Sequence, residues 1–384
     1  MRDFILIALS FFIWCIGEGL FFYFRPLYLQ QLGASPVLIG TIIALNGLAM
    51  MLVQAPGGFI ADRIGTRKVM MFSWILGTAC TLVMAFSSSL LAFSIGYVMY
   101  GLSACSAATN SYITKIRGKL NVARALTIVS AAYHLGALIG PTLGGRIGES
   151  AGLGLIYRIS TVAFALSSLI VFFTRPDRVE HHETAQKRTS LLHNRSFVML
   201  LGISFISLFS GYLAEPLTSN YLQNVHQLSL SQIGFLGSIG SLGNAVISLV
   251  FGGRSPLIGL LIGHAFLSMF SLTMWKGTGL GWYAIGFFLR GGYRIYQSMY
   301  ISVARSLTPP HEMGLAYGII STCNSIAVIL APLLAGVLYE IKPDLIYPVA
   351  LIMVGITFMI NLASARLLTH KEQEVLTEVH DPAN

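Results

Sequence analysis

The stretch Gly58-Phe59-Ile60-Ala61-Asp62-Arg63-Ile64-Gly65-Thr66-Arg67-Lys68 decides the fold of this chain. Long apolar segments lie on both sides of it, so it predicts a tight turn at the face of a membrane. Gly65 lets the backbone reverse, because glycine adopts conformations that are costly for other residues. Asp62 ends one apolar helix at a place where basic side chains gather.

The composition independently indicates a chain whose solvent is lipid. Of the 384 residues, 55% are hydrophobic and 10% are charged, and the mean hydropathy is +0.73. A soluble domain carries about 25% charged residues, so a soluble chain of this composition would lack polar groups to cover its surface. The sequence therefore predicts an all-α integral membrane protein.

Twelve segments are long and apolar enough to cross a bilayer, which needs about 20 apolar residues for each helix. They cover residues 4–30, 36–61, 68–87, 90–114, 122–147, 154–174, 197–222, 230–252, 255–275, 281–304, 314–339 and 345–368. The first segment is expected to be a retained helix and not a signal peptide, because its apolar run is too long and leads into further spans.

The basic residues predict the orientation. Most of the 24 Lys and Arg residues fall in segments that face the cytoplasm when the N-terminus is inside. An even number of helices then returns the C-terminus to the cytoplasm. The formal charge of +9 is therefore a topology signal and not a nucleic-acid surface. We expect a multi-pass protein of the inner (cytoplasmic) membrane.

One polar linker divides the chain. The expected domains are a six-helix bundle at 1–175, a cytoplasmic linker at 176–196, a second six-helix bundle at 197–369 and a cytoplasmic tail at 370–384. The two bundles share a pattern: Arg25-Pro26-Leu27 corresponds to Glu215-Pro216-Leu217.

The opening stretch resembles the loop between helices 2 and 3 of the major facilitator superfamily, Gly-x-x-x-Asp-Arg-x-Gly-x-Arg-Lys. The matching residues are Gly58, Asp62, Arg63, Gly65, Arg67 and Lys68. The resemblance implies that they take part in gating. The resemblance implies twelve transmembrane helices in two pseudo-symmetric six-helix bundles around a central cavity near mid-membrane. It also implies secondary transport by alternating access.

A second resemblance lies in the fifth segment and involves Gly136, Gly140, Pro141, Gly144 and Gly145. It is similar to the motif of facilitator antiporters, especially the bacterial drug/proton exporters, and implies a gating role. Generic packing of small residues between helices is the alternative. One departure is Tyr97, which stands four residues before Gly101, where many drug exporters have an arginine.

Charged residues inside the spans are functional candidates, because charge in lipid is costly. Glu18 lies near the middle of the first segment, and Arg294 lies about 18 Å into the tenth, close to the midplane of a core about 30 Å thick. The family layout places both helices at the cavity. The expected proton-coupling residues are Glu18, Arg294 and Asp62; a structural ion pair is the alternative.

Arg25 and Glu215 occupy corresponding places in the two halves, each just before a proline. Their depth in the membrane should match, so they are expected to form an outer gate that opens and closes once in each transport cycle.

The expected substrate cavity combines charged, aromatic and polar side chains. Its members are Glu18, Arg25, Tyr100, His134, Glu215, Arg290, Arg294 and Asn324. Aromatic residues on the cavity helices favour a lipophilic or amphipathic solute. Each polar group is also a candidate for an ordinary hydrogen bond between helices.

These features predict a secondary active transporter that exports a small organic solute by proton antiport. The alternative is proton-coupled uptake of an organic solute. This solute could be an anion, because the charged groups inside the spans carry a net positive charge. The sequence has no catalytic motif such as His-Glu-x-x-His, so no enzyme activity, metal or cofactor is expected. The expected partners are the solute, protons and the bilayer, with no nucleic acid, and the chain is expected to be a monomer.

Overall fold

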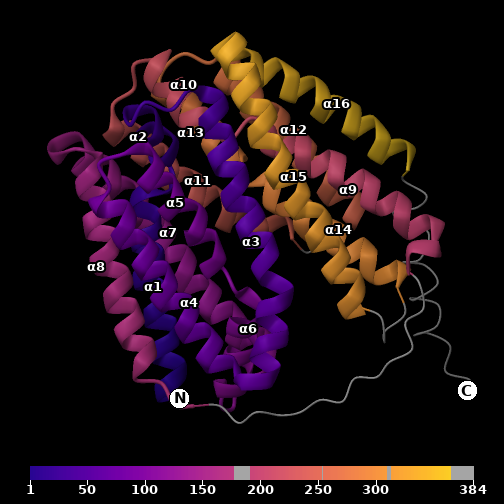
Figure 1. The fold of residues 1–384 in the computed structure, drawn as a ribbon. Helices are drawn as coiled ribbons and strands as arrows, with labels where there is room; N and C mark the ends of the chain where they lie inside the picture. Colours follow the sequence, from indigo (N-terminus) through magenta and orange to yellow (C-terminus); the bar gives the residue numbers. More distant parts are fainter. Residues whose placement is uncertain (177–190, 253, 309–312, 365–384) are drawn as a thin grey trace, which may run out of the picture. The chain divides into compact units, whose positions relative to one another are not determined.

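The computed structural model describes residues 1–176, 191–252, 254–308 and 313–364, and these residues form helices and no strand (Figure 1). Contacts divide the chain into two compact units. Unit 1 contains Met1–Thr184 and Pro216–Ser241, and unit 2 contains Ala185–Glu215 and Leu242–Asn384.

Unit 1 contains most of the first half of the sequence. Its helices are α1 (Arg2–Phe22), α2 (Arg25–Gln31), α3 (Pro36–Ile64), α4 (Thr66–Phe86), α5 (Leu90–Tyr100), the 3-10 turn η1 (Gly101–Ser103), α6 (Ser106–Ile116), α7 (Val122–Ala151), α8 (Leu153–Phe172), α10 (Thr218–Asn224) and the first half of α11 (Leu230–Phe251).

Unit 2 contains most of the second half. Its elements are the 3-10 turn η2 (Leu191–His193), α9 (Arg195–Leu213), the second half of α11, α12 (Pro256–Lys276), α13 (Leu280–Leu289), α14 (Gly292–Leu307), α15 (Met313–Ile341), η4 (Pro343–Leu345) and α16 (Ile346–Ala363).

Among the described residues, ten helices are long and apolar enough to cross a membrane, and eleven if the bent pair α5–η1 and α6 counts as one span. The remaining expected span, 281–304, consists of α13 and α14, which meet at Arg290 and Gly291. Because α13 has 10 residues and α14 has 16, each helix alone is shorter than the about 20 residues that a span needs.

Four expected segments are broken instead of continuous. The segment 4–30 is interrupted between α1 and α2, where Pro26 occupies the first turn of the new helix. The segment 197–222 is interrupted between α9 and α10 around Pro216. Proline lacks the amide hydrogen that a continuing helix needs, so each break falls where the ring can be accommodated. The segment 90–114 changes to a 3-10 turn at Gly101 and is interrupted at Ala104 and Cys105, and the segment 281–304 is interrupted at Arg290 and Gly291.

The same arrangement of helices recurs inside each unit. In unit 1, α8 packs against α1 and α4, and in unit 2, α16 packs against α9 and α12. Trp74 Nε1 lies 3.0 Å from Ser167 Oγ, and His264 Nε2 lies 3.2 Å from Thr357 Oγ1. The spacing along the chain from Trp74 to His264 equals that from Ser167 to Thr357. The pseudo-symmetry expected from the sequence is confirmed.

The loop at residues 58–68 contains a tight turn. Gly65 has a φ of 102° and separates α3 from α4, a conformation that residues with a side chain rarely adopt. The turn expected at Gly65 is therefore present.

Several expectations lie outside the described residues. These are the linker residues 177–190, the tail 370–384, the last residues of the segment 345–368 and the side chain of Asp62. The expected domain boundaries stay a prediction. The contact division differs from them in one respect, because Pro216–Ser241 groups with unit 1.

Candidate functional site

Glu18 lies in the middle of α1, between two glycines that let neighbouring helices come close. A Cβ atom at Gly17 would lie 2.8 Å from a Phe164 ring atom on α8. A Cβ atom at Gly19 would lie 3.0 Å from the Gly140 Cα atom on α7. The half-buried Glu18 carboxylate is therefore held between packed helices, where its charge needs polar partners.

Tyrosines supply those partners. The Tyr133 hydroxyl on α7 donates a hydrogen bond to Glu18 Oε2 across 3.1 Å. The Tyr100 hydroxyl at the end of α5 is a second donor for the same carboxyl group. Glu18 is thus connected to two further helices of unit 1.

Arg25 adds a positive charge to this group. Its guanidinium lies over the rings of Phe22 and Tyr97, 4.2 and 5.3 Å from their centroids, and Nε donates to Phe22 O across 3.0 Å. Its charge acts on the Glu18 carboxyl. We call Glu18, Arg25, Tyr97, Tyr100 and Tyr133 the Glu18 cluster.

An aromatic wall lies against the cluster. Tyr100 is buried, and its ring is stacked with Phe164 at 5.9 Å and with Trp14 at 6.4 Å between centroids. His134, the other candidate in unit 1, is half-buried and makes an edge contact with the Tyr133 ring at 5.5 Å. The expected candidates Glu18, Arg25, Tyr100 and His134 therefore lie in one neighbourhood.

Unit 2 has its own ionic site. Glu215 follows the end of α9 and forms an ion pair with Arg290, whose side chain is 8% exposed. Arg290 stands at the break between α13 and α14, where a Cβ atom at Gly291 would lie 2.7 Å from Gly243 O. The two charges are mutually satisfied inside unit 2.

The two remaining candidates of unit 2 lie on α14 and α15. Arg294 on α14 is exposed, although the sequence predicted it near the midplane of a membrane span. Asn324 on α15 is buried, and its Oδ1 has no hydrogen-bond partner among the described residues. The contact between Arg25 and Glu215 stays a prediction. The pair that the structure records for Glu215 is Arg290, which the sequence analysis did not match with it.

The glycines of the fifth segment bring three helices together. A Cβ atom at Gly136 would lie 2.9 Å from Ile16 N, and one at Gly140 would lie 2.7 Å from Gly19 Cα, both in α1. Gly145 faces α11 instead, where a Cβ atom would lie 3.0 Å from Ser231 Cα. These glycines permit backbone-to-backbone approach that any side chain would prevent.

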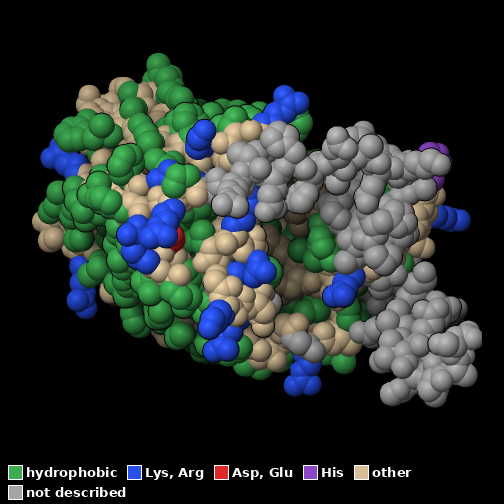
Figure 2. All heavy atoms as spheres, turned by 90° about the horizontal axis from the view of Figure 1, so that it is seen from below, with side chains coloured by type: hydrophobic (Ala, Val, Ile, Leu, Met, Phe, Trp, Pro, Cys, Tyr) green, Lys and Arg blue, Asp and Glu red, His purple; other side chains and the backbone are tan. Residues whose placement is uncertain are grey.

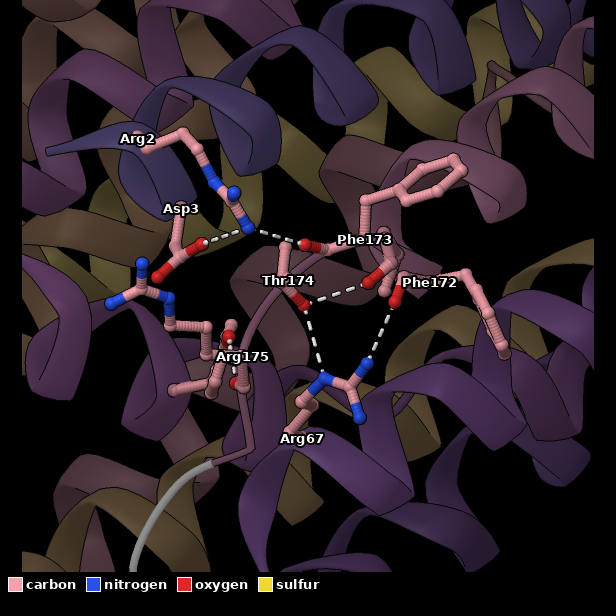
Figure 3. Close-up of polar contacts among 9 residues, drawn as sticks. Arg2, Asp3, Arg67, Phe172, Phe173, Thr174 and Arg175 are labelled. Carbon is pink, nitrogen blue, oxygen red and sulfur yellow. Dashed lines mark hydrogen bonds and ion pairs between the residues drawn. The ribbon is translucent and has the colours of Figure 1, made fainter.

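The loop motif holds the end of α8. Arg67 donates from Nη2 to Phe172 O across 2.8 Å and from Nε to Thr174 Oγ1 across 3.2 Å (Figure 3). Arg63 lies over the Phe59 ring at 4.2 Å, and Lys68 is exposed. Gly58 is less confined, because the nearest atom to an added Cβ is Ala107 Cβ at 3.6 Å.

Sequence reasoning missed a set of polar contacts between the two sequence halves, all within unit 1. Gln30 Oε1 on α2 accepts from Asn220 Nδ2 at 2.5 Å and from Asn224 Nδ2 at 3.0 Å, both on α10. Glu149 Oε2 accepts from Ser229 Oγ at 3.0 Å and from the Ser231 backbone at 2.9 Å. We call these contacts the polar clasp.

A signal for the clasp was present, because Asn220 is an amide inside an apolar segment. Its partner was not readable from the sequence, since Gln30 is far away in the chain. Among the described residues, no group of three His, Cys, Asp or Glu side chains could hold a metal.

The geometry defines a polytopic helical membrane protein with repeated helix packing and charged groups inside its spans. The family description Major Facilitator Superfamily matches residues 7–332 and 200–381. The chain therefore belongs to the major facilitator superfamily, and its relatives are named as transporters and resistance proteins.

The relatives and structural neighbours are named for different kinds of solute. Multidrug resistance protein 1 of Bacillus subtilis is 26% identical over 360 residues, which cover 88% of this chain and 90% of that protein. A solved structure of the nucleoside transporter NupG aligns with 96% of this chain and 100% of its own at a TM-score of 0.77 and 14% identity. The human organic anion transporter MFSD10 (TETRAN) aligns with 96% of this chain and 99% of its own at a TM-score of 0.67 and 18% identity. The two structural likenesses establish the fold alone.

Proposed function

We propose that the protein exports a lipophilic or amphipathic organic solute by alternating access, driven by proton antiport. The observation that carries the proposal is the Glu18 cluster, in which the carboxyl group of Glu18, inside a membrane helix, accepts hydrogen bonds from the Tyr133 and Tyr100 hydroxyls and is acted on by the charge of Arg25. A carboxyl group with such neighbours can exchange a proton when their arrangement changes. Arg294 and Asp62 are the further coupling candidates.

The aromatic wall around Tyr100 suits an apolar solute, and His134 and Asn324 are polar groups that can orient it. The resemblance of the fifth segment to antiporter motifs and the kinship with a multidrug resistance protein both support export. Within this proposal, the glycines of α7 and the polar clasp are gating elements, and Arg25 with Glu215 remains a candidate outer gate.

The proposed topology places both termini in the cytoplasm, with the chain acting as a monomer in the inner membrane. The distribution of Lys and Arg residues supports this orientation. Among the described residues, many more basic than acidic side chains are visible when the protein is seen from the side of the N-terminus (Figure 2).

The experiment uses purified protein in proteoliposomes with ethidium as an amphipathic cationic probe. An imposed pH gradient should drive ethidium movement against the proton flux, and a protonophore should abolish it. Movement that ignores the pH gradient would contradict antiport.

The second candidate is proton-coupled uptake of an organic anion. It is favoured by the cations Arg25, Arg290 and Arg294, which outnumber Glu18 and Glu215. Fluorescein in place of ethidium tests it, because symport would accumulate the dye on the side toward which protons flow.

A further inference from the structure

A groove runs along the outside of unit 1 between α4 and α8. Its volume is about 530 Å³, within the range of about 300–1,000 Å³ that is usual for ligand sites. Met71, Ile75 and Leu82 line it from α4, and Thr161, Leu169 and Phe172 line it from α8. Ile75, Leu169 and Phe172 are each more than half exposed, so the groove is open along its length.

The wall of the groove is apolar in effect, although it contains three hydroxyl groups. Thr78 Oγ1 donates to Trp74 O across 2.9 Å and lies 2.9 Å from Ser168 Oγ. Thr161 Oγ1 donates to Tyr157 O across 2.8 Å. Because each hydroxyl already has a partner in the protein, the wall suits a hydrocarbon chain better than a hydrophilic solute.

The length of the groove matches one leaflet of a membrane. The lining residues on α4 extend from Met71 to Leu82, and those on α8 extend from Thr161 to Phe172. At about 1.5 Å per residue, each row is about 16 Å long. Half of a hydrocarbon core about 30 Å thick is about 15 Å, so the groove spans the depth that one acyl chain occupies.

One end of the groove is strongly basic (Figure 3). Arg67 donates to Phe172 O, and Arg2 Nη2 donates to Phe173 O across 3.0 Å. The exposed Arg175 lies three residues after the end of α8, and Asp3, whose carboxylate lies 3.5 Å from Arg2 Nη2, is the acid of this group.

Lys68 connects this basic end to the groove. It precedes Met71 and Ile75 by three and seven residues, so it lies on the same face of α4. Its side chain is exposed. A cation therefore stands at the mouth of the apolar row, where the headgroup of a lipid in that row would lie.

We propose that the groove between α4 and α8 binds one anionic phospholipid, with an acyl chain along the apolar row and the phosphate at Lys68 and the neighbouring arginines. The apolar wall, the length of one leaflet and the basic mouth occur together at this place. Charge complementarity selects an anionic lipid, because cationic side chains near the membrane surface attract anionic headgroups.

The test measures lipid binding to purified, delipidated protein by native mass spectrometry, with phosphatidylglycerol and phosphatidylcholine offered separately. Phosphatidylglycerol should bind in preference. Lys68→Gln should weaken its binding about fivefold, since a basic residue near the surface contributes about 1 kcal/mol, and should leave phosphatidylcholine unchanged. Lys119→Gln is the matched control, because Lys119 is exposed in the loop after α6 and does not line the groove.

Two large side chains test the groove itself. Ala165→Phe fills the groove, whereas Leu166→Phe places the same ring at the next, exposed position of α8 outside the lining. Loss of bound phosphatidylglycerol in Ala165→Phe but not in Leu166→Phe supports the proposal, and Ala79→Phe on α4 repeats the test if Ala165→Phe does not fold. The proposal would be overturned if both α8 variants bound phosphatidylglycerol equally, or if the unchanged protein bound the two lipids equally. It would also be overturned if the unchanged protein formed dimers that Ala165→Phe dissociates, because the groove would then be a contact between two copies of the chain.

Discussion

The Tyr133 hydroxyl donates a hydrogen bond to Glu18 Oε2 across 3.1 Å and so connects α7 to α1. The same two helices touch through Gly136 and Gly140, whose neighbours are backbone atoms of α1. Glu18, the candidate proton carrier, is therefore hydrogen-bonded to α7, the helix that contains the antiporter-like glycines. A change in how α7 packs on α1 would also change the hydrogen bonding of Glu18, which offers a physical route from protonation to gating.

Glu18→Gln should abolish transport driven by a pH gradient while sparing exchange of solute across the membrane. The amide keeps the size of the carboxyl group and removes its titration, so only proton coupling should be lost. The two activities are measured in proteoliposomes, with an imposed pH gradient and with labelled solute on both sides. Tyr133→Phe is the companion variant and should retain gradient-driven transport at a reduced rate. Full gradient-driven transport in Glu18→Gln would rule out its role as the carrier.

Breaking the ion pair between Glu215 and Arg290 should destabilise the protein strongly. Arg290 is 7% exposed, and removing one partner of a buried pair typically costs about 3–5 kcal/mol because a charge remains without its counterion. Arg290→Ala should therefore lower the thermal unfolding midpoint in detergent by several degrees.

The exposed pair of Lys342 and Asp344 provides the control for that measurement. Its atoms lie 3.0 Å apart, and the lysine side chain is 68% exposed. Such a pair is worth about 0–1 kcal/mol, so Lys342→Ala should leave the midpoint nearly unchanged. Similar effects of the two substitutions would mean that the Glu215 pair is effectively solvated.

Gln30→Ala should raise the population of states in which the polar clasp is open. The variant removes the acceptor of two amide hydrogen bonds, each worth about 1 kcal/mol net. A loss of about 1–2 kcal/mol changes the ratio of states about 5- to 30-fold. Spin labels at Leu38 and Val225, both exposed, would report the change as a longer distance distribution. Gln31→Ala is the control, because Gln31 is an exposed neighbour. An identical distance change in both variants would mean that the clasp does not control gating.

The sequence predicted the elements that depend on local chemistry. Apolar runs predicted the spans, and glycine chemistry predicted the reversal at Gly65. The breaks near Pro26 and Gly101 were not predicted, although proline and glycine marked both places. A continuous apolar run does not reveal such breaks. Hydropathy shows that a segment lies in lipid, but it does not show whether the segment is one unbroken helix.

Partners of charged residues were harder to predict. The repeat aligned Arg25 with Glu215 and so predicted a matching depth in the membrane, but depth leaves the rotation of each helix undetermined. Arg290 reaches Glu215 because the backbone breaks between α13 and α14, which the sequence analysis treated as one helix. The contacts of α11 with α7 depend on packing between distant segments, so no local pattern could reveal them.

Asp62→Asn should raise the inward-open population, on the hypothesis that Asp62 helps to lock the inner gate with nearby cations. Arg63, Lys115 and Arg117 are the candidate partners. Removing the charge while keeping the shape isolates the electrostatic contribution. Distance distributions between labels in the two halves would measure it, and an unchanged distribution would remove Asp62 from the gate.

Gly140→Ala should destabilise the protein, because the added methyl group has no space. A Cβ atom at this position would lie 2.7 Å from both Gly19 Cα and Ile16 O, and backbone atoms cannot rotate away as side chains do. Forcing extra atoms into packed cores typically costs about 1–3 kcal/mol. Gly202→Ala in α9 is the matched control, since among the described residues no atom outside its own stretch of helix lies within 4 Å of the added Cβ. Alanine is also the better helix former by about 1 kcal/mol, so this control should be neutral or stabilising. Thermal unfolding of the two variants decides the matter: equal midpoints would mean that α1 and α7 are not held in the close contact that the glycines allow.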